Sequence, residues 1–314
     1  MVTTYKAGMA VPDWPNTYGY NLFLYPWKTW IFGPWNLFIE HGHRLFAATV
    51  GMLTIALCIV LWKTAQPRWL RILGFFALTG VIAQGILGGM RVLLNERTLA
   101  MIHGCTGPLF FAFTAALAAV SSRRWRAMPA RSTNGGTSGL LLMTIATPIL
   151  AYLQIILGAQ VRHIAPDAAP QTFQMFVFFH IALGLALSIQ IIAAAIAFLR
   201  SQLATKINAR LAWALCGLVM LQVALGCGTW IVKYGWPAIL FSGDNSVAFT
   251  VEAQSWWQAQ ITTAHVAVGS LIFALATVQA VFGVRQWWPQ LQKSRTIRSS
   301  TAERSQSLLL EAAR

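Results

Sequence analysis

Four histidines lie near the start of, or inside, long apolar stretches of this 314-residue chain: His43, His103, His180 and His265. A neutral imidazole is a strong ligand for haem iron, and the cores of helical bundles commonly hold such cofactors. On a helix, the residue four positions later lies beneath each imidazole, and it is small in every case: Ala47, Gly107, Gly184 and Gly269. We therefore expect two pairs of opposed imidazoles, each pair with room for a flat porphyrin ring.

The first of these histidines belongs to a group of ionisable residues that opens the stretch 35–62. Ionisable side chains are costly in hydrocarbon, so Glu40, His43 and Arg44 should face the protein interior or a cofactor. They share one helical face, whereas His41 is about 200° away from His43, and we assign only His43 to the site. Arg44 is expected to pair with Glu40 or with a haem propionate, and to hold Glu40 in its ionised form.

Other metal sites have too few ligands. A di-iron carboxylate site needs several acids on facing helices, but Glu40 is the one acid that we place within the membrane spans. Zinc requires three or four clustered nitrogen or sulfur ligands, and four histidines on four separate long helices do not by themselves provide such a cluster. The cysteines have no metal-ligand spacing and indicate no disulfide framework; they are Cys58, Cys105, Cys216 and Cys227. His41 and His163 are expected at the membrane interface.

The composition predicts the elements that carry these residues. The chain is 57% hydrophobic and 10% charged, with a mean hydropathy of +0.59, which indicates an all-α, polytopic membrane protein. Seven apolar runs are long enough to span a bilayer: 36–62, 70–93, 98–120, 139–161, 173–199, 211–232 and 257–284. An aromatic loop precedes them, and a polar tail, expected to be disordered, follows from residue 289.

The net charge of +15 comes from basic residues in short loops rather than from one nucleic-acid-binding patch. Sixteen of the 23 Lys and Arg residues lie in loops and the tail on one side, which the positive-inside rule makes cytoplasmic. The first loop is then external, and a further helix is expected before it. The absence of a transit-like segment favours a bacterial plasma membrane.

An internal repeat supports this arrangement. The helices that run outward end in similar phrases with the pattern Gln-x-x-Leu-Gly: "QGILGG", "QIILGA" and "LQVALGCG". The repeated unit is a helix pair. We interpret the pattern mainly as close helix packing, with glutamine bonding across the bundle.

Several motifs together identify a family resemblance. The phrase "MAVPDWP", the Glu-x-x-His-Arg opening of the next helix, "LGAQVRH" and the four histidines make the chain from about residue 7 to 284 similar to the haem A synthase family. The resemblance implies two four-helix bundles in pseudo-repeat and oxidation of the methyl group of haem O to the formyl group of haem A. It also implies haem b as resident cofactor and haem O synthase as a candidate partner. The electron acceptor is not indicated.

The resemblance further implies how the chain is divided. Residues 1–35 form the external loop, 36–131 the N-terminal bundle for the substrate haem, 132–288 the C-terminal bundle for resident haem b, and 289–314 the cytoplasmic tail. His43 and His103 match ligands of the first half, His180 and His265 those of the second, and Glu40 matches the family glutamate. The chain departs from the family in lacking a cysteine pair in the first loop and in the short loop after Arg162.

Two functions from different classes are compatible with these residues. One is the haem-modifying enzyme, with Glu40, His43 and His103 at the reacting haem. The other is a di-haem cytochrome b subunit that transfers electrons between two permanent haems. Electron carriers across a membrane usually place haems near opposite faces, whereas all four histidines here are expected near the same face, which favours the enzyme. A transporter is a weaker third interpretation, because no pair of interrupted half-helices is evident.

Overall fold

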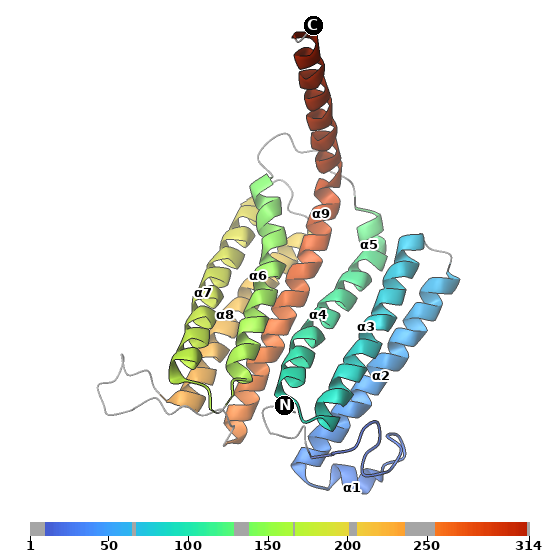
Figure 1. Cartoon of the computed structure of the whole chain (residues 1–314), viewed down its shortest axis with the longest axis vertical. Coiled ribbons are helices and arrows are strands. Elements are labelled where there is room, and N and C mark those ends of the chain that lie inside the picture. The colour runs from blue at the N-terminus through green and yellow to red at the C-terminus, as the bar shows by residue number, and fades with distance from the viewer. Residues whose placement is uncertain are drawn as a thin grey trace, which may run out of the picture.

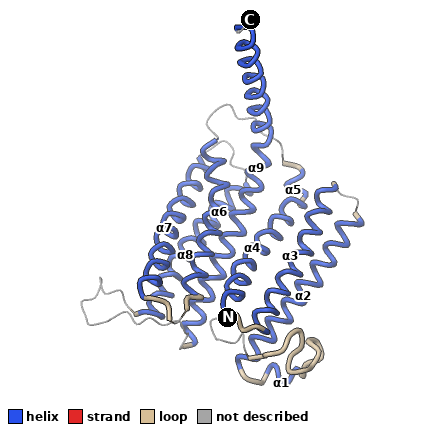
Figure 2. The backbone as a smooth tube through the Cα atoms, viewed as in Figure 1, coloured by secondary structure: helices blue, strands red, loops and turns tan. Residues whose placement is uncertain are grey.

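The computed structural model describes residues 10–64, 67–128, 138–165, 167–200, 206–235 and 255–312. These residues form helices and connecting loops, without a named strand in the described ranges (Figure 2). The helices are α1 (Trp27–Ile31), α2 (Trp35–Lys63), α3 (Arg68–Leu93), α4 (Arg97–Ser121), α5 (Arg123–Arg126), α6 (Ser138–Arg162), α7 (Pro170–Arg200), α8 (Lys206–Tyr234) and α9 (Trp256–Ala312).

Seven of these helices are long and apolar enough to cross a membrane: α2, α3, α4, α6, α7, α8 and α9. They coincide with the seven apolar runs, which confirms the predicted all-α, polytopic fold. Successive long helices run in opposite directions, so the first loop, with α1, lies at the opposite end of the molecule from the C-terminus (Figure 1).

The long helices form two adjoining groups. Helices α2, α3 and α4 pack in chain order, and α6 to α9 form a four-helix group in which α9 contacts both α6 and α8. Helix α9 also packs along α4, which joins the two groups (Figure 1). One core therefore continues from Ala112 of α4 to Ala151 of α6, Leu187 of α7, Leu215 of α8 and Ala276 of α9.

Large apolar side chains cover the outer surface of α2 and α3. Phe46 is 76% exposed, Leu53 65% and Phe75 60%. Lipid tails are as apolar as these side chains, so the helices are held together mainly by close packing rather than by the hydrophobic effect. Gly74 of α3 illustrates this, because a Cβ there would lie 3.0 Å from Cδ1 of Leu61.

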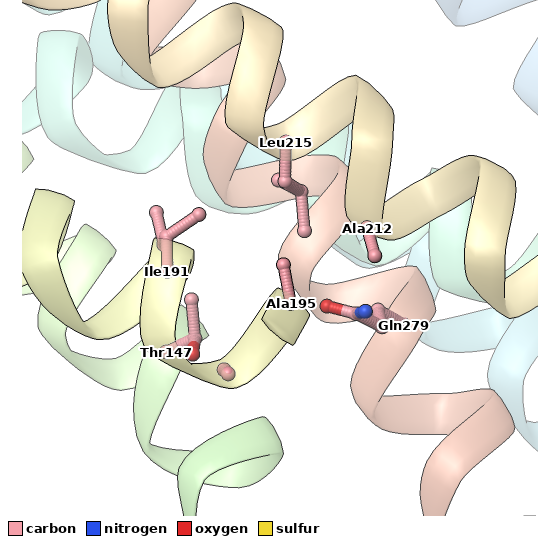
Figure 3. A pocket seen from close by; sticks show the side chains of 7 residues that line it. Thr147, Ile191, Ala195, Ala212, Leu215 and Gln279 are labelled. Carbon is pink, nitrogen blue, oxygen red and sulfur yellow. The ribbon is translucent and has the colours of Figure 1, made fainter. Parts of the chain in front are cut away.

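A small pocket lies between α6, α7, α8 and α9 (Figure 3). Ile191, Ala195 and Leu215 line it with apolar atoms, while Thr147 and Gln279 add polar atoms. None of the four site histidines lines this pocket.

The expectation of a disordered tail is wrong for the described residues. Helix α9 continues across residue 289 to Ala312 and projects beyond the ends of the other helices (Figure 1). The stretch 290–312 contains neither Gly nor Pro, and its four Leu, three Arg and three Gln favour helix, whereas its five Ser and two Thr favour it less. The last span is thus continued by a helix of mixed propensity.

Candidate functional site

The structure brings the first two predicted histidines together. His43 of α2 and His103 of α4 have ring centroids 6.4 Å apart, and their ring planes are at 84°. The imidazole of His43 is exposed, whereas that of His103 is half-buried. Two helices separated by α3 in the chain thus present opposed imidazoles.

The second pair repeats this geometry in the other helix group. His180 of α7 and His265 of α9 have ring centroids 6.2 Å apart, with ring planes at 73°. Both side chains are half-buried. The two pairs therefore share nearly the same ring separation on different pairs of helices.

This separation fits one metal atom between two imidazoles. With a metal–nitrogen bond of about 2 Å on each side and a ring centre about 1 Å behind each nitrogen, the centroids of two axial ligands lie roughly 6 Å apart. Both observed separations agree with this value. The residues present therefore fit axial ligation of a haem iron at each pair.

The glycines four residues after the histidines do not leave bare helix surface, and that prediction is wrong. A glutamine amide from the neighbouring helix covers each of them. A Cβ added at the glycine would lie within 3.8 Å of the glutamine Nε2, at Gly107 by Gln84, Gly184 by Gln154 and Gly269 by Gln222. Space for a flat ring must therefore be sought between the paired imidazoles rather than beneath each one.

Arg44 is held by Glu40 and by the first loop. Its guanidinium donates to Oε1 of Glu40 at 2.9 Å and to the carbonyls of Val11 at 2.8 Å, Asp13 at 2.6 Å and Asn16 at 2.5 Å. Of the two partners considered for Arg44, Glu40 is the one with which it forms an ion pair. Both side chains are buried, with exposed fractions of 9% for Arg44 and 2% for Glu40.

The rest of the opening of α2 also anchors the loop. Glu40 Oε2 accepts the Val11 N–H at 3.1 Å, and His41, expected at the membrane interface, is buried with its Nδ1 3.0 Å from Thr17 Oγ1. Trp14 of the loop lies against Gly89 of α3, where a Cβ would collide with the indole. The "PDWP" segment therefore closes over the ends of α2 and α3. Sequence spacing could not reveal these contacts, because they join residues 24 or more positions apart.

Asp13 fixes the turn of this loop. Its carboxylate accepts the N–H groups of Tyr18 at 2.9 Å and Gly19 at 2.8 Å, and Gly19 has a φ of +79°, which favours glycine. Burial alone would raise the pKa of Asp13, but the two backbone hydrogen bonds and the charge of Arg44 lower it below 3.8. The loop is thus stabilised by an ionised aspartate.

A group of basic residues lies near the His43–His103 pair, and these residues were not assigned to the site from the sequence. His163 follows α6, and its Nε2 would lie 3.9 Å from a Cβ at Gly104, next to the predicted ligand His103. Arg97 donates to the Ile164 carbonyl at 2.9 Å and so ties this segment to α4. Burial, and then the charges of three arginines, lower the pKa of His163 to about 4; the arginines are Arg162, Arg91 and Arg97. The signal that could have found them is their place on the side where the positive-inside rule disfavours arginine.

The fold defines a class: a multi-pass helical membrane protein, here with two pairs of opposed imidazoles. Comparison with known proteins shows a family similarity over part of the chain. Residues 34–175 match the family model COX15-CtaA, described as cytochrome oxidase assembly protein. These residues include Glu40, His43 and His103. The resemblance to the haem A synthase family is thereby confirmed for this part of the chain, which is shorter than the motifs suggested.

Two curated relatives carry the name "Heme A synthase". The protein of Lysinibacillus sphaericus (strain C3-41) is 31% identical over 136 residues, covering 41% of this chain and 44% of the relative. That of Symbiobacterium thermophilum is 30% identical over 139 residues, covering 42% and 44%. The chain thus matches less than half the length of either relative. No solved structure matches it.

Proposed function

We propose that this protein oxidises the methyl group of haem O to the formyl group of haem A, with haem b as its resident cofactor. In this conversion water supplies the formyl oxygen, the carbon–hydrogen bonds that are lost release protons, and an external oxidant receives the electrons. The observation that carries the proposal is the opposed pair His43–His103 with Glu40 one helical turn before His43. The name shared by the two relatives supports the same reaction.

The two histidine pairs are unequal, and this supports different roles for them. The residue three positions before the histidine is Glu40 in the first case but Ala100, Val177 and Thr262 in the others. His43 is also exposed, whereas the other three histidines are half-buried. We assign the substrate to the N-terminal pair, within 36–131, in which His43 is exposed, and resident haem b to the C-terminal pair, within 132–288, in which both histidines are half-buried.

A haem bound at the C-terminal pair would supply one-electron redox chemistry. The protein must manage protons and charge at the substrate. Glu40, three residues before His43 on the same helical face, accepts a proton from the attacking water or stabilises positive charge developing at the methyl carbon. Arg44 and the loop hold its carboxylate in place, since each oxygen of Glu40 already has a hydrogen bond.

Arg91 is the candidate for binding a substrate propionate. It lies in the last turn of α3, three residues after Gly88, on which the His103 ring packs. Arginine recognises carboxylates through paired, charge-assisted hydrogen bonds. We therefore place the propionate edge of the substrate toward the end of α3.

We place the protein in the bacterial plasma membrane, with the first loop external and the C-terminus cytoplasmic. Haem O synthase is the proposed partner that delivers the substrate.

Pyridine haemochrome analysis of the purified protein tests the proposal. Protein from a host without haem O should contain haem b, and incubation of that protein in membranes with haem O should yield haem A. Two permanent haems of type b, with no haem A formed from added haem O, would instead identify the electron-transfer cytochrome.

A further inference from the structure

Three helix pairs share a reciprocal contact around a predicted ligand. In each pair, the imidazole of the histidine lies on the glycine of the Gln-x-x-Leu-Gly pattern. A Cβ at that glycine would come within 3.0 to 3.2 Å of the imidazole Cε1, at Gly88 by His103, Gly158 by His180 and Gly226 by His265. In return, the glutamine amide lies on the glycine four residues after the histidine, as described above.

The main chain explains why glycine is needed. In a helix the carbonyl of residue i points toward the N–H of residue i+4, and without a side chain at i+4 a neighbouring ring can approach that carbonyl. In each pattern the glutamine is residue i and the glycine is residue i+4: Gln84 and Gly88, Gln154 and Gly158, and Gln222 and Gly226. The glycine thus opens an acceptor to the imidazole.

The glutamine side chains add polar atoms to the same place. Nε2 of Gln154 donates to the His180 carbonyl at 2.8 Å and lies 3.1 Å from the His180 Nδ1, and Nε2 of Gln222 lies 3.4 Å from the His265 Nε2. Polar atoms in these contacts are buried without a hydrogen-bond partner: Oε1 of Gln84, Gln154 and Gln222, and Nδ1 of His103 and His265. Buried polar atoms without partners are costly, so their recurrence at equivalent places indicates a function.

We infer that Gln84, Gln154 and Gln222, each with its glycine four residues later, are positioning residues for the axial histidines. An imidazole that binds metal through one nitrogen carries a proton on the other and needs an acceptor for it. The glutamine amide, once turned so that the unpartnered Oε1 rather than Nε2 faces the ring, and the main-chain carbonyl opened by the glycine would supply acceptors that fix the rotation of the ring and raise its basicity. The inference rests on the proposed haem binding and deepens it by assigning the residues that tune the ligands.

The arrangement is unequal between the pairs. Both histidines of the C-terminal pair pack on such a glycine and glutamine. In the N-terminal pair, only His103 does so among the described residues. His43 is instead followed four residues later by Ala47 and is exposed. A ligand whose rotation is not fixed suits a haem that must be exchanged.

The experiment compares glycines of α8 in the purified, full-length protein. Gly226→Ala places a Cβ 3.2 Å from the His265 ring, whereas Gly217→Ala, on the same helix, meets nothing within 4 Å. In Gly226→Ala we expect the ring to be displaced, so that the fraction of ferrous haem that binds carbon monoxide rises several-fold over wild type. Gly217→Ala should match wild type.

A second comparison separates tuning from packing. Gln222→Met keeps the volume but loses the acceptor, so the haem midpoint potential should rise because a less basic imidazole stabilises ferric iron less. Gln222→Glu should lower it. Gln190 is the control, since its amide bridges to Thr147 Oγ1 and the Met143 carbonyl rather than to a histidine, and Gln190→Met should leave the potential unchanged.

The outcomes are distinct. Wild-type protein without haem would overturn the proposed function, and this inference with it. Wild-type protein with haem, but with equal carbon monoxide binding in Gly226→Ala and Gly217→Ala and equal potentials in the glutamine variants, would overturn the positioning role alone. If Gly226→Ala does not accumulate, the potentials of Gln222→Met and Gln222→Glu decide.

Discussion

Arg44 and Glu40 form a buried ion pair, with Nη2 and Oε1 2.9 Å apart one helical turn from each other. The arginine also holds three carbonyls of the first loop, and the glutamate accepts the Val11 N–H. This pair therefore links the membrane end of α2 to the "PDWP" segment. Arg44 therefore has a structural function, because it holds in place the Glu40 carboxylate to which we assign the chemistry.

Replacement of Arg44 by alanine should destabilise the protein. It leaves the Glu40 carboxylate buried without its partner, a change that typically costs about 3–5 kcal/mol. Thermal unfolding in detergent measures this, with the exposed Lys28→Ala as control. Equal unfolding midpoints for the two variants would show that the ion pair is dispensable.

Glu40→Gln separates chemistry from structure. The glutamine amide retains an oxygen that can accept the Val11 N–H, so the loop should stay attached, but it cannot take a proton from water. We expect haem A formation to fall at least about 100-fold, in the range for loss of a general base, while the haem b spectrum is retained. Unchanged haem A production in membranes supplied with haem O would leave Glu40 a purely structural role.

The loop should detach in acid. Because the pKa of Asp13 is lowered in the folded state, its stabilising contribution is complete well above the ordinary value of 3.8 and is lost as pH falls through the lower folded value. Proteolysis of the loop by pepsin should accelerate below that value, relative to cleavage of an unrelated denatured substrate. In Asp13→Asn, the rate of loop cleavage relative to that of the denatured substrate should not change with pH. If this variant showed the same acid dependence as the wild type, Asp13 would be excluded as the cause.

Membrane topology can be checked by labelling of introduced cysteines in intact cells. Ala127→Cys, exposed after α5, should resist a membrane-impermeant reagent if its arginine-rich loop is cytoplasmic, as proposed. Lys28→Cys, exposed in α1, should react. Labelling of position 127 but not of position 28 would invert the proposed orientation.

The spans and the four histidines could be predicted from local patterns, whereas the division of the histidines into pairs came from the family resemblance. A span needs about 20 apolar residues, and the observed helices agree with the predicted runs to within a few residues. The contacts of Gly107, Gly184 and Gly269 were predicted wrongly, since spacing along one helix does not show which side chain of a neighbouring helix covers it. The loop contacts of Arg44 were missed for the same reason.

The central claim is that the two histidine pairs hold different haems, and single alanine substitutions test it most directly. In a host that makes no haem O, His180→Ala or His265→Ala should abolish the haem b spectrum of the purified protein. His43→Ala or His103→Ala should retain most of that spectrum and eliminate haem A formation once haem O is supplied. Loss of haem b from the N-terminal variants with retention in the C-terminal ones, or equal loss from all four, would contradict the account.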